Sequence, residues 1–242
     1  MNVIGKTHIG LVRENNQDAL EYGSLGTIAQ YAVVCDGMGG ANGGNIASKI
    51  AVEVIGSRIR DGYRDNPNPG LPEHLLTSAM ATANAGVYDR AQKEPTLGGM
   101  GTTVVAVITY GHTAYISHVG DSRLYLYRDG KLSQVTRDHS VVQELIESGQ
   151  ITEVEARSHP RKNYITRAIG VVSEEYGEYD ELELMAGDRL LLCTDGLTNE
   201  VNSADMCQLL TLPAEESTQA LIRAALDNGG KDNITVALMD ID

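Results

Sequence analysis

Phenylalanine and tryptophan are both absent from this chain of 242 residues, and tyrosine, with 11 copies, is its only large aromatic residue. Aromatic side chains normally contribute much of the apolar area that a protein core buries. Aliphatic side chains and methionine must therefore carry the packing. With 42% hydrophobic and 21% charged residues the composition is nevertheless that of a globular protein, and the chain is long enough to bury a substantial core.

Basic residues are also scarce, since 19 Lys and Arg stand against 33 Asp and Glu and give a formal net charge of −14. Nucleic acids and anionic membranes attract basic surfaces, so neither is an expected partner. No apolar run approaches the roughly 18 residues of a membrane span. The N-terminal stretch MNVIGKTHIG lacks the apolar core of a signal peptide. We therefore expect a soluble, cytoplasmic protein.

Cysteine is rare, with three copies at Cys35, Cys193 and Cys207. Such a small, odd number fits a reducing compartment, and the first two lie inside apolar runs, as small buried residues do. No CxxC or HxxxH spacing indicates a zinc site. Neither a GxSxG elbow nor a GxxxxGK[ST] loop occurs, which disfavours serine-hydrolase and P-loop nucleotide chemistry.

Linker composition and internal repeats are lacking as well, so one domain spanning 1–242 is expected. The spacing of apolar residues predicts strands at 28–36, 102–110, 112–119, 122–130, 131–136, 179–185, 188–196 and 233–241. It predicts helices at 45–60, 75–87, 141–149, 151–158, 202–211 and 213–228, and a turn-rich loop at 64–72. The four strands between 102 and 136 have the pattern of a meander. Segregated helices and strands favour an α+β fold over a doubly wound parallel sheet.

Five aspartates from distant parts of the chain stand beside apolar runs or near the N-terminus, namely Asp18, Asp36, Asp121, Asp195 and Asp232. Carboxylates displayed at strand ends are the oxygen ligands that Mg²⁺ and Mn²⁺ prefer. An arginine close to one of them could bind phosphate oxygens through its planar fork. The combination indicates metal-assisted chemistry on a phosphate.

Each motif alone also has a simpler interpretation. The segment DGMGGANGG (36–44) could be a turn, since Asp-Gly between apolar runs is a hairpin signal. Its five glycines in nine residues exceed what a turn needs, and it leads into a helix N-terminus, where anions bind readily. Arg13 could be an ordinary surface residue and His139 an ordinary loop histidine. The order of the motifs therefore matters more than any one of them.

Taken in order, the motifs RENNQD, VVCDGMGG, GMGTT, VGDSRLY, TRDHS, LLLCTDGL and GGKDNITV resemble those of the metal-dependent protein serine/threonine phosphatases of type 2C, the PPM family, in its compact bacterial form. The resemblance covers essentially the whole chain. It implies a four-layer αββα sandwich, in which two packed antiparallel sheets are flanked by helices. It also implies a small helical flap at 138–177 that lies beside the catalytic cleft.

The resemblance further implies two Mn²⁺ or Mg²⁺ ions in the site. Asp36 would bridge both ions. Asp195 and Asp232 would complete the ligands of one ion, and the carbonyl of Gly37 would bind the other. Asp18 would act through a metal-bound water.

Other positions are implied by the same resemblance. Asp121 would help to hold a third, weaker ion, and Arg13 would bind the phosphate. Bacterial members often carry a histidine directly after DGMGG, where this chain has Ala41. Animal relatives commonly have one at the position of Met38. His139 is thus a candidate general acid, and a metal-bound water is the alternative.

The implied reaction is attack of a metal-activated water on the phosphoryl group of phosphoserine or phosphothreonine in proteins, so no nucleophilic Ser or Cys is required. Implied partners are phosphorylated proteins, among them a Ser/Thr protein kinase that the enzyme would oppose, and the expected state is a monomer. Three alternatives stay open. They are a non-catalytic binding module on the same fold, a metal-dependent phosphodiesterase or nuclease, and a dedicated regulator of one phosphoprotein, such as an anti-anti-sigma factor.

Overall fold

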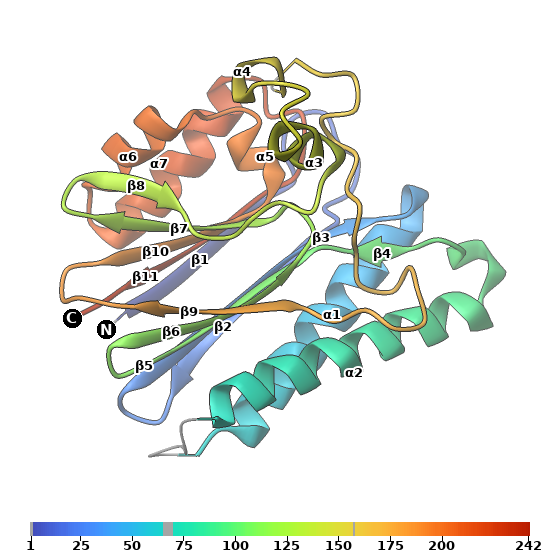
Figure 1. Ribbon diagram of the computed structural model, residues 1–242, viewed down its shortest axis with the longest axis horizontal. Coiled ribbons are helices and arrows are strands. Elements are labelled where there is room, and N and C mark those ends of the chain that lie inside the picture. The colour runs from blue at the N-terminus through green and yellow to red at the C-terminus, as the bar shows by residue number, and fades with distance from the viewer. Residues whose placement is uncertain (1, 65–69, 157) are drawn as a thin grey trace.

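Two β-sheets pack face to face between two layers of helices (Figure 1) in the computed structural model, which describes residues 2–64, 70–156 and 158–242. The first sheet contains, in spatial order, β1 (Asn2–His8), β11 (Ile234–Asp240), β10 (Arg189–Cys193), β7 (Arg123–Arg128) and β8 (Lys131–Gln134). The second contains β2 (Asp18–Leu25), β3 (Ala29–Met38), β5 (Val104–Tyr110), β6 (Thr113–Val119) and β9 (Glu178–Glu183), and the short β4 (Gly101–Thr102) pairs with the end of β3. Neighbouring strands run antiparallel throughout.

Helices cover the outer face of each sheet. The second sheet is covered by α1 (Gly40–Gly62) and α2 (Leu71–Lys93), and the first by α5 (Asp195–Thr198), α6 (Ser203–Leu209) and α7 (Ala214–Asp227). A 3₁₀ turn, Pro95–Leu97, follows α2. Among the described residues, no helix combines the length and hydropathy that crossing a membrane requires. The predicted α+β fold with two helix-flanked antiparallel sheets is confirmed.

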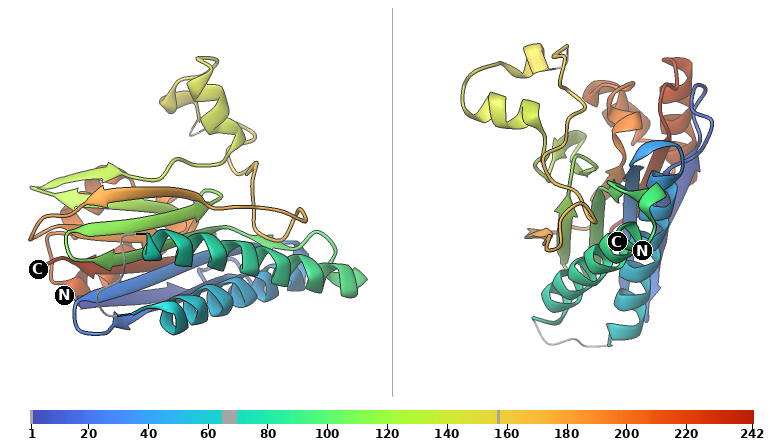
Figure 2. Two further views of the ribbon diagram at one scale, coloured as in Figure 1. Left: turned by 60° about the horizontal axis from the view of Figure 1, so that its bottom comes forward. Right: turned by 90° about the vertical axis from the view of Figure 1, so that its right-hand side faces the viewer.

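Two short helices, α3 (Val141–Glu147) and α4 (Glu153–Ala156), lie apart from the sandwich and project from one end of it (Figure 2). Ser140 caps α3, because its hydroxyl accepts the backbone N–H of Gln143 at 3.3 Å. Both helices fall where short helices were predicted. They belong to the chain segment 138–177, which leaves the first sheet after β8 and returns to the second sheet at β9.

The core is aliphatic, as the absence of Phe and Trp predicted. Its largest fully buried side chains are all isoleucine, leucine or methionine. Along β10, Leu190 and Leu192 face the layer between the sheets, while Leu191 and Cys193 face the helices. A strand buried on both faces needs apolar residues at every position, which explains the continuous run LLLC.

The predicted meander between 102 and 136 is wrong as a single sheet. β5 and β6 pair in the second sheet, whereas β7 and β8 pair in the first. The chain changes sheets at Gly120–Ser122, between the end of β6 and the start of β7. Gly120 adopts φ of +100°, which is the left-handed region that favours glycine, and this redirects the chain. Strand spacing alone does not distinguish a hairpin from such a crossing.

The remaining predicted helices and strands are found, with ends shifted by a few residues. The sequence pattern did not predict β1, β2, the short β4, the 3₁₀ turn at Pro95–Leu97 or α5. The predicted loop at 64–72 falls partly outside the described residues, because 65–69 are not among them.

Replacing Leu192 by alanine should destabilise the fold by about 2–5 kcal/mol, because the side chain is fully buried between the sheets and leaves a cavity. Urea unfolding measures this change in the free energy of unfolding. The matched control is Val154→Ala, at a side chain that is 77% exposed, and it should change stability by less than about 0.5 kcal/mol. Equal effects of the two substitutions would contradict the assignment of the core.

Candidate active site

A cleft of about 580 Å³ lies at the end of the sandwich where strands of both sheets terminate. Six of the residues that the sequence singles out line it, namely Arg13, Asp36, Gly37, Asp121, Asp195 and Asp232. They come from the N-terminal loop, the end of β3, the turn after β6, the start of α5 and the loop before β11. The fold thus brings together side chains that lie up to 219 positions apart.

The backbone of Asp36 is fixed by two threonines of the GMGTT motif. Its N–H donates to Thr103 Oγ1 at 3.0 Å, and its carbonyl accepts both the N–H of Thr103 and the hydroxyl of Thr102 at 2.9 Å. Thr103 Oγ1 also lies 2.6 Å from Ser122 Oγ, in the turn that carries Asp121. The sequence predicted Asp36 after a strand, but β3 continues to Met38. These hydroxyl groups therefore fix the position of this stretch beside the cleft.

Gly37 has no room for a side chain. A Cβ atom there would lie 2.0 Å from the carbonyl oxygen of Gly44 and 2.7 Å from that of Gln17. Its N–H donates to Gln17 O at 3.1 Å. The glycine therefore allows the start of α1 and the start of β2 to approach the end of β3.

Asp18 does not line the cleft but lies buried behind it. Its Oδ2 accepts the hydroxyl hydrogens of Thr235 at 2.6 Å and Thr194 at 2.9 Å. Its Oδ1 is buried and has no hydrogen-bond partner among the described residues. A buried carboxylate oxygen without a donor is costly, so a cation or a bound water is the expected partner.

Burial, together with the charges of neighbouring carboxylates, raises the pKa of four of the aspartates. Desolvation and the neighbouring charges of Asp18 and Asp195 raise the pKa of Asp36 well above its usual range. Desolvation also raises the pKa of Asp18 to about 7 and, together with Asp195, that of Asp121 to about 8. The pKa of Asp195 is raised by desolvation and by Asp232. A site with this excess of clustered carboxylates fits hard divalent cations, which would replace the missing positive charge.

The basic side chain of Arg13 lines the cleft and forms an ion pair with one of these aspartates. Its Nη2 donates to Asp232 Oδ2 at 2.6 Å, and this hydrogen bond is the main reason that the pKa of the guanidinium is raised. The Arg13 side chain remains 51% exposed. A guanidinium has five N–H donors, so it can keep Asp232 and still bind an anion that enters the cleft.

Asn233 was not singled out by the sequence, although it holds the loop that carries Arg13. Its Nδ2 donates to the carbonyls of Ile9 at 2.8 Å and Asn15 at 3.0 Å, and its Oδ1 accepts the N–H of Gln17 at 2.7 Å. The side chain is buried, at 4% exposure. Asn233 therefore clamps both ends of the N-terminal loop beside Asp232. Its place in KDNITV, next to a candidate ligand, was the only available signal.

The candidates for a general acid are placed differently. His139 is not among the residues that line the cleft, and both of its ring nitrogens have close polar neighbours elsewhere. Met38 does line the cleft, but its thioether has no proton to donate. The side chain of Ala41 lies outside the described residues. A general-acid role of His139 thus stays a prediction that this geometry does not favour.

Comparisons with known proteins agree with this site and fold. A family model described as protein phosphatase 2C matches residues 4–238. The serine/threonine protein phosphatase PstP of Mycobacterium tuberculosis is 38% identical over 236 residues, which are 96% of this chain and 43% of PstP. The chain thus spans less than half the length of that relative. This chain belongs to the protein phosphatase 2C family, as its motifs predicted.

Solved structures give the same result. A serine/threonine phosphatase of S. agalactiae has a TM-score of 0.92 and 37% identity, and the match covers 100% of this chain and 99% of that one. The catalytic domain of a phosphatase PstP, in complex with two manganese ions, has a TM-score of 0.88 and 36% identity, with 100% and 98% of the chains covered. The second structure is that of a relative with bound metal.

The raised pKa values predict how the stability of the metal-free protein depends on pH. Between about pH 4 and pH 8 the folded protein holds protons on Asp18 and Asp121 that the unfolded chain has released. The free energy of unfolding should therefore fall as pH rises through this range. Urea unfolding in a chelating buffer at pH 5.5 and pH 8 measures it.

Asp18→Asn should flatten this pH dependence, because the amide cannot ionise. Asp89→Asn, at an exposed position on α2, should leave it unchanged. A stability that rises with pH in the chelated wild-type protein would contradict the raised pKa values.

Proposed function

We propose that this chain is a metal-dependent phosphatase that hydrolyses phosphoserine and phosphothreonine in proteins. The observation that carries the proposal is the cluster of carboxylates with raised pKa values around a cleft that also contains Arg13. Membership of the protein phosphatase 2C family and the similarity to PstP, a serine/threonine protein phosphatase, support the same reaction.

The donor set supports sites for Mn²⁺ or Mg²⁺. Asp36, Asp195, Asp232 and the carbonyl of Gly37 would hold two ions, and Asp121 with Asp195 would hold a third, weaker one. The relative with two manganese ions supports the first pair. Such cations lower the pKa of water and offset charge on phosphoryl oxygens.

The chain's own groups contribute binding and orientation. Arg13 would bind the phosphoryl oxygens through N–H groups that Asp232 does not use. Asp18, oriented by Thr194 and Thr235, would accept a proton or a hydrogen bond at Oδ1. No serine or cysteine occurs among the described residues that line the cleft, and the Thr103 hydroxyl is bonded to Asp36 and Ser122. The described part of the lining thus offers no free hydroxyl or thiol nucleophile, and the phosphoryl group would pass directly to water without a phosphorylated enzyme intermediate.

We further propose that residues 1–242 form one catalytic domain and that 138–177 is its flap. Asn163 and Ile165 of that segment line the cleft, which supports a role beside the substrate. Phosphorylated proteins would be the partners, among them a Ser/Thr kinase that the enzyme opposes. The net charge of −14 supports neither nucleic acid nor membrane binding, and we propose a cytoplasmic monomer.

The first test is phosphate release from a phosphothreonine peptide in the presence of a chelator, Mg²⁺ or Mn²⁺. Release should require a metal and should vanish in Asp36→Ala, which removes the carboxylate that four other aspartates surround. Asp89→Ala is the matched control and should retain activity. Bis(p-nitrophenyl) phosphate, a diester, should not be hydrolysed.

Metal-independent release, or equal release by Asp36→Ala, would contradict the proposed chemistry. No release by a protein that still melts cooperatively would favour the binding-module alternative. Hydrolysis of the diester alone would favour a phosphodiesterase.

Arg13→Ala should raise KM for the peptide by about tenfold and lower kcat less, because a charge-assisted hydrogen bond to the bound phosphate is lost. Steady-state kinetics measures both constants. Arg90→Ala, at an arginine of similar exposure on α2, should change neither. A drop in kcat at unchanged KM would instead assign Arg13 to the transition state alone.

A further inference from the structure

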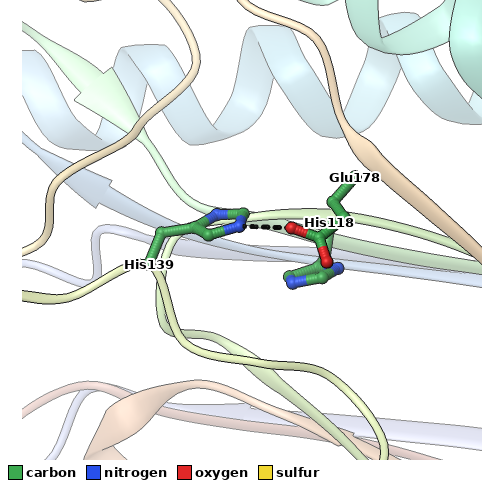
Figure 3. Close-up of side chains that lie close together, drawn as sticks. All are labelled: His118, His139 and Glu178. Carbon is green, nitrogen blue, oxygen red and sulfur yellow. Dashed lines mark hydrogen bonds and ion pairs between the residues drawn. The ribbon is translucent and has the colours of Figure 1, made fainter. Parts of the chain in front are cut away.

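A second polar cluster lies outside the cleft. It consists of His118 at the end of β6, His139 and Glu178 at the start of β9 (Figure 3). The two imidazole rings stack with centroids 4.9 Å apart, and one potential ligand atom of each residue lies within 4.8 Å of the others. These side-chain types commonly bind transition metals. A ring nitrogen binds a metal only when it carries no proton, so the positions of the ring protons decide whether a metal could bind here.

The hydrogen bonds argue against a metal here. The N–H of Gly120 donates to His139 Nδ1 at 3.1 Å, so this nitrogen carries no proton. The ring proton is therefore on Nε2, which lies 3.0 Å from Glu178 Oε2 and donates to it. A metal at Nε2 would require His139 to lose its last proton.

The surroundings add to this argument. Arg167 Nη1 lies 3.1 Å from the same Nε2 and brings a positive charge. A guanidinium only donates and cannot donate to a nitrogen that carries a proton, so in this tautomer Glu178 is the hydrogen-bond partner of Nε2. His118 has its Nε2 2.9 Å from the carbonyl oxygen of Arg137, to which it donates. Both ring nitrogens of His139 and Nε2 of His118 are thus already engaged in hydrogen bonds.

His139 holds the turn before Asp121 by its main chain as well as its ring. Its N–H donates to Gly120 O at 2.9 Å, while its Nδ1 accepts Gly120 N–H. Both polar backbone groups of Gly120 are therefore bonded to one residue. A Cβ at Gly120 would lie 2.6 Å from Thr103 Cγ2, so the turn also packs tightly against Thr103, whose hydroxyl accepts the N–H of Asp36.

The other contacts of His139 lead to the segment that returns from the two projecting helices. The carbonyl of His139 accepts the N–H of Thr166 at 2.8 Å. Arg167 donates to Glu175 Oε1 at 2.7 Å and to Tyr176 O at 2.5 Å, and its Nη1 lies 3.9 Å from Glu178. One histidine therefore connects the base of the 138–177 segment with the turn that displays Asp121.

We propose that His139, as the neutral Nε2–H tautomer, is a positioning residue that fixes the Gly120–Asp121 turn, and that Glu178 holds this tautomer. The effect on catalysis rests on the proposed function, in which Asp121 contributes to a cation site. The hydrogen-bond assignment itself does not depend on that function. Displacing the base of the 138–177 segment would thus loosen Asp121.

The first experiment uses NMR of the full metal-free chain and needs no activity. The ¹⁵N shifts of His139 should identify Nε2 as the protonated nitrogen, and the Gly120 amide should be protected from hydrogen exchange. His139→Gln removes the acceptor at the Nδ1 position and should accelerate Gly120 exchange by about tenfold or more. His139→Asn keeps an oxygen near that position and should retain most of the protection.

A protonated Nδ1, or equal Gly120 exchange in the wild type and both variants, would overturn the proposal. Cooperative melting of each variant shows that it is folded. Because His139→Asn and His139→Gln both lose the imidazole, a general loss of packing would affect them alike.

The second experiment tests the link through Glu178. Glu178→Ala should weaken Mn²⁺ binding, measured by calorimetry, and lower kcat by about tenfold while KM for the peptide changes little. Glu178→Gln keeps an acceptor for Nε2–H and should restore most of both. Glu183→Ala, at an exposed glutamate of the same strand, is the matched control and should behave as wild type.

Equal losses in Glu178→Ala and Glu178→Gln, or no loss in either, would overturn the role of Glu178. If the wild-type protein releases no phosphate under any condition, the proposed function fails. The tautomer and exchange measurements would still decide the positioning role of His139.

Discussion

Repulsion between carboxylates that share one end of the sandwich is the constraint on which the site depends. Desolvation raises the pKa of Asp36 most, and the charges of four other aspartates raise it further. Hydrogen bonds, rather than many basic side chains, hold these aspartates in place. Thr102 and Thr103 hold the backbone of Asp36, and two further threonines hold Asp18. A divalent cation would neutralise the residual negative charge, so the same crowding that costs stability would favour binding of such a cation.

Both sheets supply parts of the site, and the aliphatic layer between them sets their relative position. Asp36 belongs to the second sheet, whereas Asp195 and Asp232 border strands of the first. The interior between the sheets consists of alanine, valine, leucine, isoleucine and methionine side chains. Close-packed aliphatic side chains resist sliding, because any shift opens voids. The packing of the core therefore fixes how the aspartates of the two sheets lie relative to one another in the cleft.

Much of this organisation could be predicted from local patterns. Apolar periodicity located α1, α2, α7 and most strands, and the order of the motifs identified the family. The crossing at Gly120 could not be predicted, because a hairpin and a change of sheet have similar strand spacing. Asn233 was missed for a related reason. Its partner Gln17 lies 216 positions away, and only the folded chain brings such partners together.

The pairing of β1 with β11 has a consequence for synthesis of the protein. β11 lies between β1 and β10, so β1 has no partner in its sheet until residues 234–240 exist. Asp232 and Asn233, which position Arg13 and its loop, are made only shortly before. A nascent chain on the ribosome could form the second sheet and its helices before β11 is made, but its cleft would stay incomplete until β11 emerged. Under the proposed function, a nascent chain that still lacks residues 232–240 would therefore have no phosphatase activity.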